Sequence, residues 1–185
     1  MSISKPPKGF KTRKKESGAT TVAPDFFAGG DAAERDYVGA AQTICLNALA
    51  GRAKSRGELA AHLKRRGIPI DVANEVLDRL ERSGLINDLD FARAWSTSRM
   101  SSKKISKRVL AMELRKKGVA DDLIALALEE FSSDDEFEAA LQLGSRKARS
   151  LVNYEAEVRE RRITSALARK GYNYSIISRV LREVC

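Results

Sequence analysis

The sequence predicts an all-α protein: a tandem array of three three-helix units, elongated and curved, that follows a disordered N-terminal arm. Three glycines set the repeat, because Gly67, Gly118 and Gly171 lie 51 and 53 residues apart and have matching neighbours. A leucine stands four residues before each glycine, and an apolar or aromatic residue stands directly after it. Repeats of this length are typical of helical units that stack on one another to complete their cores.

A helix with one buried face is expected downstream of each glycine. The apolar residues there follow the i, i+1, i+4, i+5, i+8 spacing of such a face, and strand-like alternation is absent. In the first unit they are Val72, Ala73, Val76, Leu77 and Leu80, and the pattern recurs over residues 123–131 and 176–184.

Two further helices are expected in each unit, both upstream of the glycine. The first helices are placed at about residues 38–50, 88–100 and 134–146, and the second helices at about 56–66, 103–117 and 154–170. Asn87 and Asp88 suit the start of the middle unit's first helix, since short polar side chains cap helix N-termini. The predicted boundaries of the three units are 37–83, 84–132 and 133–185.

Residues 1–36 are expected to form a disordered basic arm. Pro6 and Pro7 open it, a basic run follows at residues 11–15, and no apolar period appears. Burial therefore cannot offset the entropy cost of ordering this segment. Its charge could contact a phosphate backbone, but the composition favours a solvated tail.

Composition indicates a polyanionic partner and a reducing compartment. The 185 residues include 34 Lys and Arg against 25 Asp and Glu, a formal net charge of +9 that favours nucleic acid or an acidic protein surface. No apolar segment is long enough for a signal sequence or a bilayer span. Two cysteines, Cys45 and Cys185, are too few for a disulfide framework. We therefore expect a monomeric cytoplasmic protein without membrane contact.

The sequence offers no constellation for catalysis, a cofactor or a metal. His62 is the single histidine and lies in a polar run, so neither a nucleophile–base pair nor a zinc-ligand spacing can be assembled. The acidic pairs, such as Asp121 and Asp122, fall at expected helix ends. We expect a protein that works by binding, with no cofactor.

Cations concentrate on the second helix of each unit, and these are the candidate partner-binding residues. They are Arg56, Lys64, Arg65, Lys103, Lys104, Lys107, Arg108, Arg115, Lys116, Lys117, Arg161, Arg162 and Arg169. Cations in a last helical turn are favoured by the helix dipole by ~0.3–1 kcal/mol, which explains the pairs that precede each glycine without any partner. The run from Lys103 to Arg108 is expected to open a helix, where the dipole disfavours cations. Its four cations are therefore the leading candidates for anion contact.

A helix-turn-helix reader of duplex DNA is the first rival, because helices joined by a glycine turn suit that motif. Its recognition helix should be basic. Here the helix after the first glycine carries Asp71, Glu75, Asp78 and Glu81, and the second copy is acidic as well. Like charge would hold these helices away from a phosphate-lined groove, which disfavours major-groove reading.

Several motifs resemble the signature of the RecX regulatory family. They are the stretch Gly84-Leu-Ile-Asn-Asp-Leu-Asp-Phe-Ala-Arg-Ala-Trp95, the segment Arg52-Ala-Lys-Ser-Arg-Gly-Glu-Leu59 with His62-Leu-Lys-Arg-Arg-Gly-Ile68, and Glu113-Leu-Arg-Lys-Lys-Gly-Val119. The resemblance covers residues 37–185 in the expected order and includes the triple repeat. It departs mildly at Pro69 and at the Gly-Tyr-Asn-Tyr174 stretch of the third unit.

This resemblance implies a modulator of the RecA recombinase. Such proteins bind the RecA filament on single-stranded DNA, typically within its helical groove, and limit its growth or promote its disassembly. ATP hydrolysis, strand exchange and the coprotease activity behind the SOS response would then fall. The alternative is a plain nucleic-acid-binding module that acts without RecA.

Overall fold

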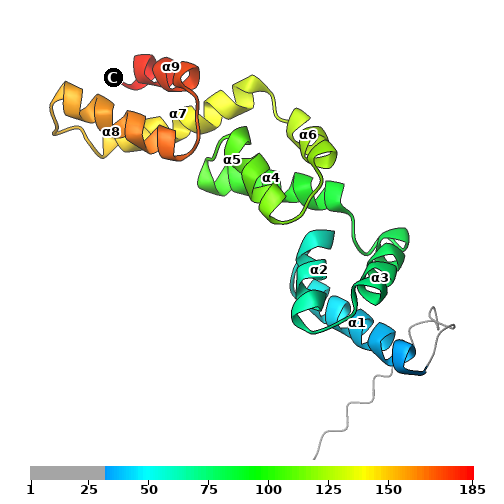
Figure 1. Cartoon of the computed structure of the whole chain (residues 1–185). Helices are drawn as coiled ribbons and strands as arrows, with labels where there is room; N and C mark the ends of the chain where they lie inside the picture. The colour runs from blue at the N-terminus through cyan, green and yellow to red at the C-terminus, as the bar shows by residue number, and fades with distance from the viewer. Residues whose placement is uncertain (1–31) are drawn as a thin grey trace, which may run out of the picture.

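The computed structural model describes residues 32–185, with side chains from residue 36 onward, and that part of the chain is helical without strands. The first helices of the three units are α1 (Ala32–Gly51), α4 (Asp88–Lys103) and α7 (Ser133–Arg149). The second helices are α2 (Arg56–Arg65), α5 (Lys107–Lys116) and α8 (Ala156–Arg169), and the third are α3 (Ile70–Arg82), α6 (Asp121–Glu129) and α9 (Tyr174–Val184). The units follow one another in an elongated, curved array, as Figure 1 shows. The all-α tandem fold is thereby confirmed.

The three glycine turns are built alike. Gly67, Gly118 and Gly171 have φ angles of 76°, 78° and 88°, which is the left-handed conformation that glycine adopts without a steric cost. In the first unit the Gly67 N–H donates to the Lys64 carbonyl at 3.1 Å, and the Ile68 N–H donates to the Leu63 carbonyl at 3.2 Å. The same two bonds recur after α5 and α8. Each second helix therefore ends in a Schellman motif, which turns the chain into the third helix.

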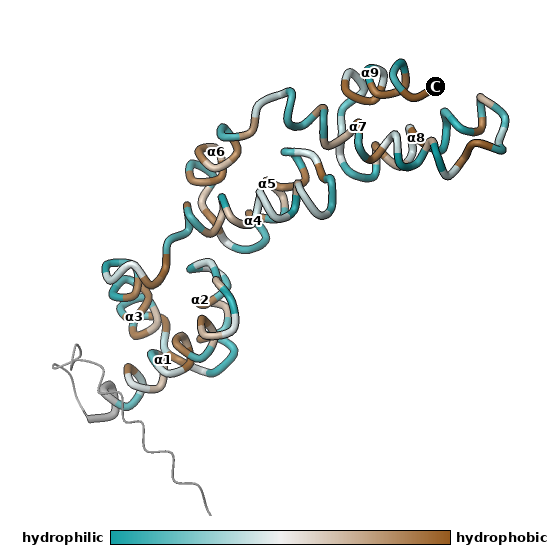
Figure 2. Tube along the Cα trace, turned by 180° about the vertical axis from the view of Figure 1, so that it is seen from behind, coloured by the Kyte–Doolittle hydropathy of each residue, from teal (hydrophilic) through white to brown (hydrophobic). Residues whose placement is uncertain are grey.

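Each unit has its own apolar core. Leu63, Leu114 and Leu167, the leucines four residues before the glycines, are completely buried at equivalent positions. The third helix of each unit packs its apolar stripe against the first and second helices. Figure 2 shows the apolar parts of the chain turned toward one another within each unit. The repeat in the sequence thus predicts both the turns and the cores.

Two predicted helix boundaries are wrong. The helix expected over residues 103–117 is in fact the last residue of α4, a short connection and the whole of α5, because α4 runs to Lys103 and α5 begins only at Lys107. Lys104 has a φ angle of 48° and caps α4, while buried Ser106 caps α5. At the other end of the array α1 begins at Ala32, inside the predicted arm, and residues 1–31 of that arm lie outside the described residues.

Candidate partner-binding surface

The first turn of α2 lies on the glycine turn that ends α5. The Ser55 hydroxyl donates to the Lys117 carbonyl, and the Arg56 N–H donates to the Asp88 carboxylate at 2.7 Å. The two backbones come so close that a Cβ atom on Gly57 would lie 2.6 Å from the Cα atom of Gly118. Only a pair of glycines permits this approach of the first unit to the second.

The first turn of α5 lies on the glycine turn that ends α8 in the same way. The Ser106 N–H donates to the Lys170 carbonyl at 3.0 Å, and the Lys107 N–H donates to the Glu136 carboxylate at 3.0 Å. A Cβ atom on Gly171 would lie 2.4 Å from a methyl carbon of Val109. The connection between units therefore repeats, with a serine N-cap on one side and a glycine turn on the other.

These two connections place α2, α5 and α8 end to end along the array. Each of these helices carries an exposed cation two residues before its glycine: Arg65, Lys116 and Arg169. We call these three residues the second-helix row. They lie in last helical turns, where the dipole favours positive charge, so their position costs the helices nothing.

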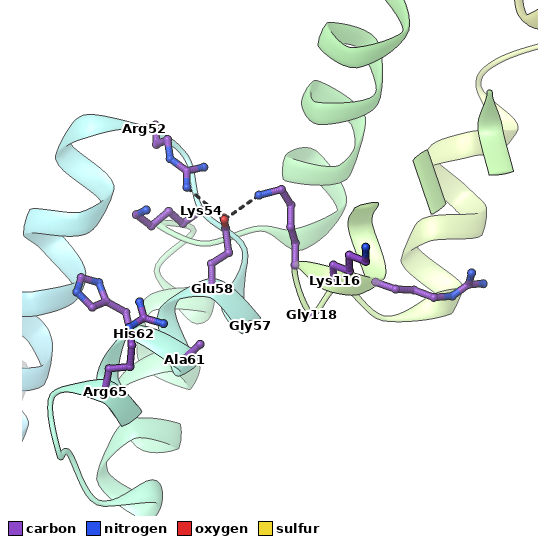
Figure 3. A pocket seen from close by; sticks show the side chains of 11 residues that line it. Arg52, Lys54, Gly57, Glu58, Ala61, His62, Arg65, Lys116 and Gly118 are labelled. Carbon is purple, nitrogen blue, oxygen red and sulfur yellow. Dashed lines mark hydrogen bonds and ion pairs between the residues drawn. The ribbon is translucent and has the colours of Figure 1, made fainter. Parts of the chain in front are cut away.

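A basic hollow of about 420 Å³, here called the junction cleft, opens where the first unit meets the second. Six lysine and arginine side chains line it against one carboxylate, that of Glu58: Arg52, Lys54, Arg65, Arg115, Lys116 and Lys117. Figure 3 shows Glu58 between an arginine of its own unit and a lysine from the second unit. The distances are 3.2 Å to Arg52 and 2.8 Å to Lys117.

Glu58 is held ionised by these two cations. Partial burial would raise the pKa of its carboxyl group, but the hydrogen bonds and charges of Lys117 and Arg52 outweigh it and hold the pKa below its usual value. The neighbouring carboxylate of Asp88 shows the opposite balance, because its burial raises the pKa despite the hydrogen bond from Arg56. The cleft therefore contains one neutralised carboxylate and a surplus of positive charge.

Trp95 of α4 marks the second unit's side of the junction. The Nζ atom of Lys117 lies 3.9 Å from the ring centroid and the guanidinium of Arg99 lies 4.3 Å from it, in cation–π positions. The indole N–H donates to Glu113 at 2.9 Å, and the ring stacks on Phe91 at 5.9 Å between centroids. Trp95 is therefore paired with Phe91, and through Lys117 it is coupled to Glu58 of the first unit.

The structure separates the predicted cations into engaged and open groups. Three of the engaged cations form ion pairs: Arg56 with Asp78 and Glu81 at 2.6 Å, Arg115 with Asp121 at 2.6 Å, and Lys117 with Glu58. Two others make weaker contacts, because Arg162 lies over the Tyr154 ring at 4.2 Å and Arg169 donates to the Ser165 hydroxyl at 2.9 Å. The exposed members with neither an ion pair nor another side-chain contact among the described residues are Lys64, Arg65, Lys103, Lys116 and Arg161, while Arg108, Arg162 and Arg169 are exposed and have no ion pair there.

The argument that favoured the run from Lys103 to Arg108 is wrong in its premise. Lys103 ends α4 and Lys104 caps it, so both lie where the dipole favours cations. Lys107 and Arg108 do open α5, but the Lys107 ammonium donates to the Phe131 carbonyl and the Arg108 Nε–H donates to the Gly171 carbonyl at 3.4 Å. The Lys107 side chain is therefore used within the second unit, and the Arg108 side chain connects the second unit to the third, which explains both cations without a partner.

Sequence reasoning left other cations out of the candidate set. Arg52 and Lys54 line the junction cleft beside His62, and Arg146 and Arg149 of α7 line a second hollow with Lys104. Arg52 and Lys54 could have been found from the sequence, because they lie beside Ser55. Ser55 and Ser106 occupy the same position in two repeats, and each lies where one unit contacts the next. Lys104 meets Arg146 and Arg149 only through tertiary packing, which no local pattern reveals.

Within residues 32–185 no helix is both long and apolar enough to cross a bilayer. Nowhere in the same range do three or more His, Cys, Asp or Glu side chains gather in a way that could hold a metal ion.

Comparison with known proteins identifies the family. Family models for the first, second and third three-helix domains of RecX match residues 41–80, 87–128 and 134–181. The chain is 43% identical over 149 residues to the regulatory protein RecX of Streptomyces coelicolor, covering 80% of this chain and 79% of that protein. The RecX of Mycolicibacterium smegmatis is 44% identical over 140 residues, covering 74% of each chain.

Solved structures agree in fold. The crystal structure of RecX from Lactobacillus salivarius superposes with a TM-score of 0.73 at 24% identity, covering 81% of this chain and 97% of that one. A second crystal structure of a regulatory protein RecX gives the same TM-score at 22% identity. The resemblance predicted from the motifs is confirmed, and the chain belongs to the RecX family of regulatory proteins.

Proposed function

We propose that this protein binds the RecA filament on single-stranded DNA and limits its extension, which lowers ATP hydrolysis, strand exchange and SOS coprotease activity. The printed name of its relatives, regulatory protein RecX, supports a regulatory role. The observation that carries the proposal is the second-helix row: Arg65, Lys116 and Arg169 lie at one repeat position on three helices joined end to end.

A periodic array of weak contacts suits a periodic partner. One exposed ion pair contributes only about 0.2–1 kcal/mol, which is too little to hold a regulator on its target. Several such contacts on one rigid body act together, because each contact raises the effective concentration for the next. A nucleoprotein filament repeats its anionic surface along its axis, so an elongated, curved array with one exposed last-turn cation per unit, none of them in an ion pair among the described residues, can engage successive protomers.

The steady-state ATPase of RecA on single-stranded DNA tests this proposal. The informative variant is Lys116→Glu with Arg169→Glu, which reverses two members of the row. Its matched control is Arg82→Glu with Arg182→Glu. The control changes net charge equally and also alters last-turn cations, so loss of helix-dipole energy is the same in both.

The wild-type chain should inhibit the ATPase when present well below one copy per RecA protomer. The row variant should need about tenfold more protein for half inhibition, equal to ~1.4 kcal/mol of binding free energy, while the control should behave as wild type. Equal inhibition by the row variant would refute the role of the row. Inhibition that appears only when the protein saturates free DNA would instead support the module that acts without RecA.

A further inference from the structure

The two connections between units differ in what holds them. A buried apolar cluster spans the second and third units, because Met100, Ile105 and Leu110 pack with Ala139 of α7. Between the first and second units, Ile86 of the α3–α4 connection joins the first unit's core, but no described residue of α4, α5 or α6 does. That junction depends on the hydrogen bonds of Ser55 and Arg56 and on the Glu58–Lys117 ion pair. Such polar contacts are individually weak in water, so this is the softer of the two connections.

Unpaired positive charge faces this soft junction from both sides. Lys54 and Arg65 line the junction cleft from the first unit and Lys116 lines it from the second, and none of the three has an ion pair among the described residues. Glu58 is already neutralised by Arg52 and Lys117. The remaining like charges repel one another across the cleft, and an anion between them would convert repulsion into attraction.

The lining favours a phosphodiester over a protein side chain. Protein interfaces are anchored by apolar and aromatic residues at their centre, yet the apolar lining here is limited to Ala61 and two glycines. The cleft also lacks an aromatic platform on which bases could stack, since His62 is its single ring. Lysine and arginine contacts to phosphate oxygens need neither feature and carry no sequence information.

We propose that the junction cleft binds the phosphodiester backbone of a single strand, and that the bound strand fixes the first unit relative to the second. Phosphates between Lys54 and Arg65 on one side and Lys116 on the other join α2 to α5, whose described residues share no buried apolar cluster. Binding is independent of base sequence. The proposal does not depend on RecA, and its test omits RecA.

Trp95 provides the readout, because it is the chain's one tryptophan and lies under Lys117 at the junction. The full-length protein is titrated with an oligothymidylate while indole emission and small-angle X-ray scattering are followed. The variant is Arg65→Glu with Lys116→Glu, the matched control is Arg82→Glu with Arg182→Glu, and a second probe is polyglutamate at equal charge concentration.

The oligothymidylate should produce a saturable change in Trp95 emission and a scattering profile that fits one fixed arrangement of the units. The cleft variant should bind at least about tenfold more weakly than the control, and its salt slope should fall by about 0.7 for each lost phosphate contact. An equal response to polyglutamate would overturn the phosphodiester assignment, and equal affinity of variant and control would overturn the cleft. Binding without any change in emission or scattering would overturn the fixing of the junction. None of these three outcomes bears on the RecA ATPase experiment, which tests the proposed function separately.

Discussion

Replacing Gly57 with alanine should open the junction between the first two units while it strengthens the helix that contains the substitution. Alanine in place of glycine in the middle of a helix stabilises it by roughly 0.5–1 kcal/mol, and Gly57, in the first turn of α2, gains no more than that. The added Cβ atom, however, would lie 2.6 Å from both the Gly118 Cα atom and the Lys117 carbonyl oxygen. Carbon atoms normally pack at about 3.5–4 Å, and both neighbours are backbone, so the first turn of α2 must move away by about 1 Å.

That movement breaks the contacts that hold the junction. The hydroxyl of Ser55 loses the Lys117 carbonyl and the N–H of Arg56 loses Asp88, each worth about 0.5–1.5 kcal/mol. The junction therefore loses about 1–3 kcal/mol, while the core of the first unit, centred on residues such as Leu63, is untouched. The thermal midpoint of unfolding should hold or rise slightly even as the two units separate.

Amide hydrogen exchange at Arg56 measures the opening directly, because a first-turn N–H has no acceptor inside its own helix and depends on Asp88. Exchange should accelerate about five- to 150-fold for an opening cost lowered by 1–3 kcal/mol. The control is Gly39→Ala in α1, which makes the same chemical change in a helix with nothing within 4 Å of the new methyl group. Wild-type protection of the Arg56 amide in Gly57→Ala would refute the claim that the glycine contact sets the spacing of the units.

Three further outcomes follow from burial and charge. Leu114→Ala should cost about 2–5 kcal/mol by chemical denaturation, because the side chain is fully buried and its removal leaves a cavity, and Leu63→Ala should cost a similar amount in its own unit. The pKa of Glu58 is lowered in the folded state, so its contribution is present above the unfolded-state pKa and is lost as the pH falls through the lower folded-state value. Acid should therefore loosen the junction, and a Glu58→Gln variant should show no such acid-dependent change in scattering. Burial raises the pKa of the Cys45 thiol to about 11, so thiol reagents at pH 8 should modify exposed Cys185 at once and Cys45 only after unfolding.

The fold was predictable because its determinants are local and repeated. A glycine that needs a positive φ angle, a leucine four residues earlier and an apolar stripe after it define one second helix, one turn and one third helix. Boundaries were less predictable. Lys104 adopts a left-handed conformation that glycine or asparagine usually supplies, so no residue of the usual type marked the end of α4, and the register of Ser106 with Ser55 was the one signal for the start of α5.

The candidate surface was predictable in kind but not in detail. The surplus of cations on the second helices is visible in the sequence, and the second-helix row follows from the repeat alone. Which cations are already engaged depends on contacts between residues far apart in the chain. Arg108 reaches the carbonyl of Gly171, 63 residues away, and Lys117 reaches Glu58, 59 residues away. Periodicity places side chains on a helix, but it does not say which helix end meets which turn.

The contacts between units repeat just as the cores do. The residues that make these contacts are missing from the outer end of the first unit and from the outer end of the third. Asp88 and Glu136 lie four residues before the completely buried alanines of α4 and α7, and each accepts an N–H from the preceding unit. At the same position in the first unit stands Tyr37, which has no carboxylate. In the third unit Arg159 occupies the place of the capping serine, and α8 already begins at residue 156. The contact that joins units within the chain is therefore incomplete at both ends, so it cannot join one chain to the next.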